Sequence, residues 1–147
     1  MTVTNRKDLS RAIARMVPYI IQGAQLGFLA GRAITHTQFF VLVSVHSAES
    51  CAMKTLAENM KVSMPTMSGI VERLVKAGLL RRLDNPGDRR QVMVGLTAEG
   101  KNVISQFQDV ISRRWEEVLE ILNAGEMDSL RVVMEKIAQG LGRKNKE

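Results

Sequence analysis

The stretch from residue 54 to residue 96 constrains the fold most, because its sequence predicts two helices and two strands in quick succession. Apolar residues at helical spacing predict a short helix over residues 54–60. A second helix begins at Ser63, a good N-cap, and Pro65 lies in its first turn, where a missing N–H costs no hydrogen bond. Gly78 ends this second helix as a C-cap residue.

Two short strands are predicted directly after the second helix, over residues 79–83 and 91–96. Residues 85–88 have the sequence Asn-Pro-Gly-Asp, which is typical of a turn, so the two strands form a β-ribbon. The tip of the ribbon carries Arg89 and Arg90. This order is that of a winged helix-turn-helix: a short helix, a brief turn, a helix with polar residues at its N-terminus, and a β-ribbon with a basic tip. The predicted fold class is therefore mainly α with a small β-ribbon.

Two helices are predicted before this region. The first covers residues 8–31, and Pro18 removes a backbone donor inside it, so we expect this helix to be kinked or divided. The second covers residues 36–47, with Thr35 or Thr37 as its N-cap. A stripe of glycines at four-residue spacing predicts the close approach of another backbone to the first helix. These glycines are Gly23, Gly27 and Gly31.

Two further helices close the chain. Thr97 caps the first of them, which continues to a break at residues 123–125, where the sequence is Asn-Ala-Gly. The last helix is predicted over residues 126–140. The helices at both ends of the chain are apolar along one face only, and such a face needs a cover.

Residues 16–31 and 33–48 contain no charged side chain, yet neither is predicted to cross a membrane. Each stretch is sixteen residues long and is interrupted by glutamine or histidine, whereas a span needs about 20 predominantly apolar residues. The N-terminus lacks the apolar core of a signal peptide. The single cysteine excludes an intramolecular disulfide and fits a reducing compartment, so a cytoplasmic location is expected.

The positive charge of the chain is concentrated away from its C-terminal third. The net charge of +6 comes from five basic against two acidic residues in 1–49 and eight against five in 50–100, while 101–147 holds eight of each. This distribution favours double-stranded DNA as the partner, because small polar groups can read base edges and arginines can contact phosphates or enter a minor groove. The candidate DNA-binding residues are Ser63, Met64, Pro65, Thr66, Ser68, Gly69, Arg73, Asp88, Arg89 and Arg90.

From residue 35 to about residue 104 the chain carries a series of short motifs in a fixed order. They are Thr35-His36-Thr37-Gln38-Phe39-Phe40-Val41-Leu42, Leu56-Ala57-Glu58-Asn59-Met60, Val62-Ser63-Met64-Pro65-Thr66-Met67-Ser68, Val71-Glu72-Arg73-Leu74, Gly78-Leu79-Leu80-Arg81-Arg82, Asp88-Arg89-Arg90 and Leu96-Thr97-Ala98-Glu99-Gly100. Taken together, their order and spacing resemble the multiple-antibiotic-resistance regulator (MarR) family of winged-helix transcription factors.

The resemblance implies a homodimer in which the helix beginning at Ser63 reads the major groove in each half of a palindromic operator. It implies that Arg90 enters the minor groove and that Asp88 holds the side chain of Arg90 in position. The chain departs from the family at Ala52, where a Ser or Thr often caps the third helix, so a weaker start of that helix is expected.

The resemblance also implies a repressor that a small aromatic or phenolic ligand releases from its operator. The ligand would bind between the dimerisation helices and the DNA-binding lobe, and would change the separation of the two recognition helices. The implied organisation is a single domain, 1–147, with a winged-helix DNA-binding lobe at 35–100 and N- and C-terminal dimerisation helices at 1–34 and 101–147.

A redox- or metal-responsive regulator on the same scaffold is the alternative. Cys51 is a candidate thiol sensor, although its neighbours in the sequence are mostly apolar. His36 and His46 with Cys51 fit no compact metal-ligand spacing, so no metal or cofactor is expected. Residues 95–102 nearly spell a phosphate-binding loop, but Asn102 replaces the required Ser or Thr. No motif for catalysis is found, and a non-enzyme is expected.

Overall fold

The computed structural model describes residues 5–144 of the chain. The chain divides into two compact units, one ending at Ile111 and one beginning at Ser112. In chain order the elements are α1 (Arg6–Ala30), α2 (His36–Ala48), β1 (Ser50–Ala52), α3 (Met53–Met60), α4 (Met64–Lys76), β2 (Leu80–Leu83), β3 (Met93–Leu96), α5 (Ala98–Leu119) and α6 (Ala124–Lys144).

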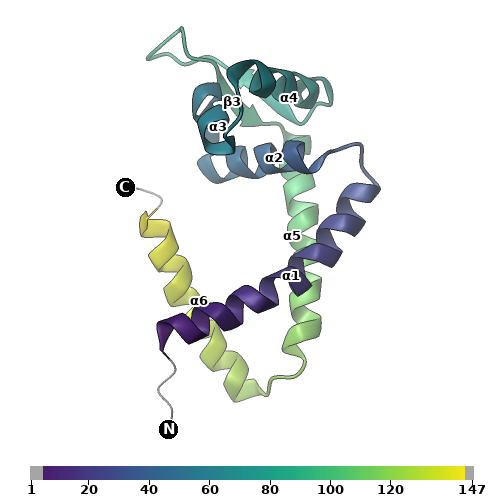
Figure 1. Ribbon diagram of the computed structural model, residues 1–147, viewed down its shortest axis with the longest axis vertical. Helices are drawn as coiled ribbons and strands as arrows, with labels where there is room; N and C mark the ends of the chain where they lie inside the picture. The colour runs from purple at the N-terminus through teal and green to yellow at the C-terminus, as the bar shows by residue number, and fades with distance from the viewer. Residues whose placement is uncertain (1–4, 145–147) are drawn as a thin grey trace. The chain divides into compact units, whose positions relative to one another are not determined.

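The first unit contains a winged helix-turn-helix lobe, which confirms the predicted fold class. Its strands form an antiparallel sheet in the order β1-β3-β2, so that Val94 in the central strand pairs with Cys51 on one side and with Arg82 on the other. The predicted ribbon is β2 and β3, and β1 was not predicted. In Figure 1, α3 and α4 lie together beside this sheet with α2 next to them.

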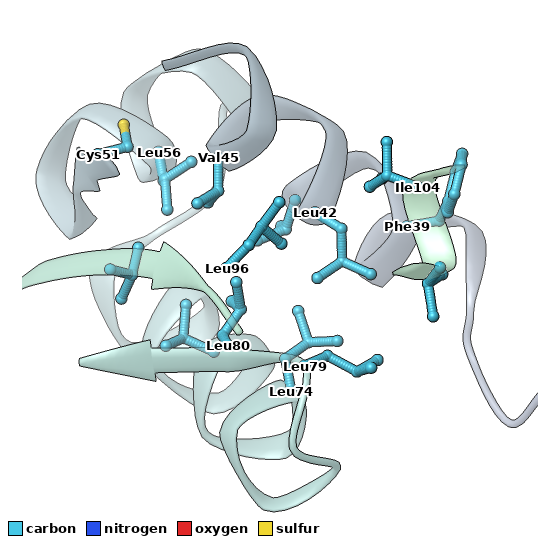
Figure 2. Packing of buried hydrophobic residues seen from close by; sticks show 14 of the residues in the cluster. Phe39, Leu42, Val45, Cys51, Leu56, Leu74, Leu79, Leu80, Leu96 and Ile104 are labelled. Carbon is cyan, nitrogen blue, oxygen red and sulfur yellow. The ribbon is translucent and has the colours of Figure 1, made fainter. Parts of the chain in front are cut away.

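The lobe has one apolar core, to which α2, α3, α4 and the sheet all contribute (Figure 2). In α4, Met67, Val71 and Leu74 recur at helical spacing and are almost completely buried. Each such side chain contributes about 1.5–3 kcal/mol by leaving water. The largest fully buried side chains are Leu42, Leu56, Met67, Leu74, Leu80, Val41, Val45, Val71 and Val94.

The helix ends follow the predicted capping chemistry. Thr35 caps α2 in a reciprocal arrangement with Gln38, and Thr97 Oγ1 accepts a hydrogen bond from the N–H of Gly100 at the start of α5. Gly78, just after α4, has φ +75°, which favours glycine. Ala52 makes no side-chain cap for α3, as expected, and this helix begins instead with a backbone bond from Met53 N–H to the Val92 carbonyl, 3.0 Å.

An aromatic cluster and one arginine tie α1, α2 and the first part of α5 together within the first unit. The ring centroids of Phe28, Phe39 and Phe107 lie 4.7–6.0 Å apart. The Arg32 guanidinium lies 3.8 Å from the centroid of the Phe28 ring, donates to the Phe28 carbonyl and donates to Oε1 of Gln106.

The structure bears on two expectations for α1. Of the two outcomes expected at Pro18, division is excluded, since the helix continues from Arg6 to Ala30. No backbone approaches two glycines of the predicted stripe among the described residues: a Cβ added at Gly27 or Gly31 would meet nothing within 4 Å. Packing among the described residues therefore does not require glycine at these two positions.

The second unit contains the end of α5 and all of α6. Asn123 and Glu126 cap α6 reciprocally, so the helix begins at Ala124, two residues before the predicted start. No residue in 112–141 is buried. Among the described residues, no helix combines the length and the apolarity needed to cross a membrane.

Candidate nucleic-acid interface

The N-terminus of α4 presents two hydroxyl groups that are already ordered. Ser63 Oγ accepts a hydrogen bond from the N–H of Thr66 at 3.2 Å and lies 2.8 Å from Thr66 Oγ1. The bond between the two hydroxyls uses one of their two hydrogens, so one remains for an acceptor outside the protein. This corner of α4 can therefore donate to a phosphate or a base edge without losing the helix cap.

The outward surface of α4 carries the other predicted recognition residues. Met64, Pro65 and Arg73 are exposed, whereas Ser68 and Gly69 are half-buried. A Cβ added at Gly69 would meet nothing within 4 Å, so the fold of the free chain does not require glycine there. The missing side chain leaves the helix backbone open to a close approach from outside.

Arg73 is available for an anion, because no carboxylate lies within 4.0 Å of it in the part of the chain that the structure describes. The neighbouring Lys76 instead pairs with Glu72 at 3.3 Å, the predicted pair four residues apart on the exposed helix surface. Arg73 thus adds an unpaired positive charge to the outward surface of α4.

The loop between β2 and β3, residues 84–92, is the tip of the wing and projects away from the helices of the lobe (Figure 1). Arg89 and Arg90 are exposed on it, and neither has a carboxylate within 4.0 Å among residues 5–144. Asp88 acts on the backbone: its Oδ1 accepts from the N–H of Arg90 at 3.0 Å. The carboxylate therefore fixes the chain at Arg90 and leaves the guanidinium free.

Two further residues that the sequence reasoning did not select order the wing tip. Asn85 Oδ1 accepts from the N–H of Gly87 at 3.0 Å, and Asn85 Nδ2 donates to Gln91 Oε1 at 2.9 Å. Asn85 lies in the predicted turn, and the turn-forming composition of residues 85–88 is the sequence feature that could have pointed to it. No local pattern pointed to Gln91.

The structure gives no support to a thiol sensor at Cys51. The residue is only 8% exposed, and burial raises the pKa of its thiol above the ordinary value of 9.0. A reactive cysteine needs the opposite shift and access to solvent.

The candidate metal ligands are not brought together either. His36 and His46 lie ten residues apart on α2, which separates their backbones by about 15 Å. No group of three or more His, Cys, Asp and Glu side chains is placed to hold a metal ion within residues 5–144.

Comparisons with known proteins agree on one family. The family model described as MarR matches residues 34–92. The multiple antibiotic resistance protein MarR of Salmonella typhimurium is 32% identical over 111 residues, which cover 75% of this chain and 77% of that protein. The transcriptional repressor MdtR of Bacillus subtilis is 30% identical over 122 residues, covering 81% of this chain and 77% of that protein.

A crystal structure of a mutant MarR from Escherichia coli complexed with operator DNA is also similar. It has a TM-score of 0.56 and 26% sequence identity, and the match covers 91% of this chain and 99% of the other. The family comparisons point to transcriptional regulators of winged-helix fold.

Proposed function

The chain belongs to the MarR family and is a DNA-binding transcriptional regulator, and from this premise we propose that it is a homodimeric repressor of a palindromic operator. The observation that carries the proposal is the pairing of an open, polar α4 surface with a wing tip whose two arginines have no acidic partner among the described residues. These are the two surfaces that a winged helix offers to a major groove and to an adjacent minor groove.

In this proposal α4 reads the bases. Ser63 and Thr66 supply hydroxyl groups, Ser68 adds another, and the methyl-bearing side chain of Met64 can contact a thymine methyl. Gly69 lets the helix backbone come close to the groove, because no side chain projects there. Arg73 contacts a phosphate at the edge of the groove.

The wing supplies the second contact. Arg90 enters the minor groove, where the negative potential attracts a guanidinium. Arg89 follows the phosphate backbone, and Asp88 fixes the backbone from which both arginines project. Contacts of this kind release counterions, so the affinity for DNA falls steeply with salt.

Uncovered apolar faces in both units support a dimer. The first half of α1 exposes Leu9, Ile13, Met16 and Val17, whereas the buried residues of this helix begin at Ile20 and lie in its second half: Ile20, Ala24, Phe28 and Leu29. In the second unit, the exposed large apolar residues are Trp115, Ile121, Met127, Leu130, Val132, Val133, Met134, Ile137 and Leu141. A monomer rarely leaves so many large apolar side chains in water, so a second copy of the chain is the natural cover.

Replacing Arg90 by alanine tests the DNA-binding surface. We expect at least tenfold weaker binding to a duplex that the protein selects from a random-sequence library, together with a salt slope smaller by about one unit. Arg113→Ala is the matched control, since it removes the same charge from an exposed position in the second unit. Equal affinities for Arg90→Ala and the unmodified protein at physiological salt would show that the wing does not bind DNA.

Two measurements test the remaining parts of the proposal. Sedimentation equilibrium at micromolar concentration should give the mass of two chains, and a monomer there would contradict the dimer. Small aromatic and phenolic compounds, screened for release of the selected duplex, test the ligand. Retention of DNA with every compound would contradict release by this class of ligand.

A further inference from the structure

We infer that Asn85 and Gln91 are positioning residues for the wing: the hydrogen bond between their side chains orders the tip before DNA arrives. The inference rests on the proposed DNA contact of Arg90. It adds two uncharged residues to the interface without requiring either of them to touch DNA.

The wing tip consists of two successive turns. The N–H of Asp88 donates to the Asn85 carbonyl at 3.2 Å, and the N–H of Gln91 donates to the Asp88 carbonyl at 3.0 Å. The Asn85 and Asp88 side chains each accept from the backbone two residues ahead, at Gly87 and Arg90. Each turn is thus stabilised by its own first residue.

The bond from Asn85 Nδ2 to Gln91 Oε1 is different, because it joins the start of the first turn to the end of the second. It closes residues 85–91 into a loop, and Arg89 and Arg90 lie within that segment of the sequence. Asn85 is half-buried as a residue, whereas Asp84 and residues 86–92 are all exposed, so Asn85 is the least exposed residue of the tip. Because Oδ1 accepts from Gly87, the amide nitrogen is left to donate to Gln91.

The consequence for binding is a smaller ordering cost. An exposed loop without internal ties loses conformational entropy when it docks, and that loss reduces affinity. A tip that is already closed has lost part of this entropy during folding. Removing the hydrogen bond between the Asn85 and Gln91 side chains should therefore weaken DNA binding, while the contacts that the protein makes with DNA in the complex stay the same.

The test uses Asn85→Ala, Gln91→Met and the double variant with the same selected duplex. We expect each single variant to bind about threefold to tenfold more weakly, as the net value of one or two hydrogen bonds implies. The double variant should bind like Asn85→Ala, because Asn85→Ala alone already removes the bond between the two side chains. The salt slope should stay at its original value in all three, since no charged contact is removed.

Hydrogen exchange of the free protein supplies an independent readout. Amides in residues 84–92 should exchange faster in Asn85→Ala and Gln91→Met, but not in Gln91→Glu, whose carboxylate still accepts from Asn85. Additive losses in the double variant would show that Gln91 contacts DNA itself, and would overturn the inference. Unchanged affinity or a reduced salt slope would also overturn it.

Arg90→Ala separates this inference from the proposed function. If Arg90→Ala binds DNA normally, the wing contact itself is wrong. If Arg90→Ala is weakened and the Asn85 and Gln91 variants are not, the wing contact stands and only the positioning role is wrong.

Discussion

Gly100 is the position at which an added methyl group would test the junction between the lobe and α5 most severely. A Cβ at Gly100 would lie 2.1 Å from the carbonyl oxygen of Leu79 and 3.0 Å from Leu96 Cδ2. The Leu79 carbonyl accepts from the N–H of Thr97 at 3.1 Å, and Thr97 Oγ1 donates to the Gly78 carbonyl at 2.6 Å. Leu79 and Leu96 lie within the buried cluster of the lobe (Figure 2).

The cost of Gly100→Ala follows from these contacts. A carbon and an oxygen without a bond between them stay roughly 3.2–3.5 Å apart, so the Leu79 carbonyl must retreat by about 1 Å. Overpacking of this kind costs about 1–3 kcal/mol, and the strained bond to Thr97 adds about 1 kcal/mol. The better helix propensity of alanine returns up to about 1 kcal/mol. The expected loss in the free energy of unfolding is therefore about 2 kcal/mol.

Urea denaturation followed by circular dichroism measures this loss, at one fixed protein concentration because the protein is proposed to be a dimer. Gly69→Ala is the control, since its added methyl group meets nothing within 4 Å in α4 and should raise stability by up to about 1 kcal/mol. A Gly100→Ala protein as stable as the unmodified chain would refute the reasoning. So would a Gly69→Ala protein that loses as much stability as Gly100→Ala.

Two further predictions concern β1 and the residue before it. Because burial raises the pKa of the Cys51 thiol above 9.0, the folded state holds this proton more tightly than the unfolded chain. The thiol's contribution to stability is therefore complete below pH 9 and is lost as the pH rises above it. Urea denaturation from pH 8 to 10.5 should show this loss for the unmodified protein, and Cys51→Ser should not show it. Glu49 has φ 62° and ψ −45°, so Glu49→Gly should relieve backbone strain and raise the free energy of unfolding by about 1 kcal/mol. A destabilised Glu49→Gly protein would contradict the strain.

The parts of the fold that the sequence predicted correctly depend on local chemistry. Ser63 and Thr97 cap helices by reaching backbone groups three residues away, so the information lies within one turn. Gly78 ends α4 through its own positive φ. No described residue lies beside Gly27 or Gly31 of the α1 glycine stripe, and spacing along a helix does not contain the information on what lies beside it.

The missed features depend on partners that are distant in the sequence. β1 has only three residues, and it is a strand because Cys51 pairs with Val94. Its three residues show no alternating pattern long enough to predict a strand. The candidate DNA-binding residues could be selected because polar and basic types at the front of a helix and at a turn have a recognised chemistry. The bond from Asn85 to Gln91 could not, because either side chain has many acceptable partners.

The contacts of α5 restrict how a ligand could release the operator. Val103 and Ile104 are buried in the core of the lobe, and Phe107 packs against Phe28 and Phe39, so the first part of α5 moves with the lobe. The helix then continues without a break to Leu119, beyond the end of the first unit. A ligand can change the separation of the recognition helices only by binding one arrangement of these elements better than another. In the proposed dimer, three places meet this requirement: the contacts of the aromatic cluster, with Arg32 at its edge, the exposed first half of α1, and the chain beyond Ile111, where no described side chain up to residue 141 is buried.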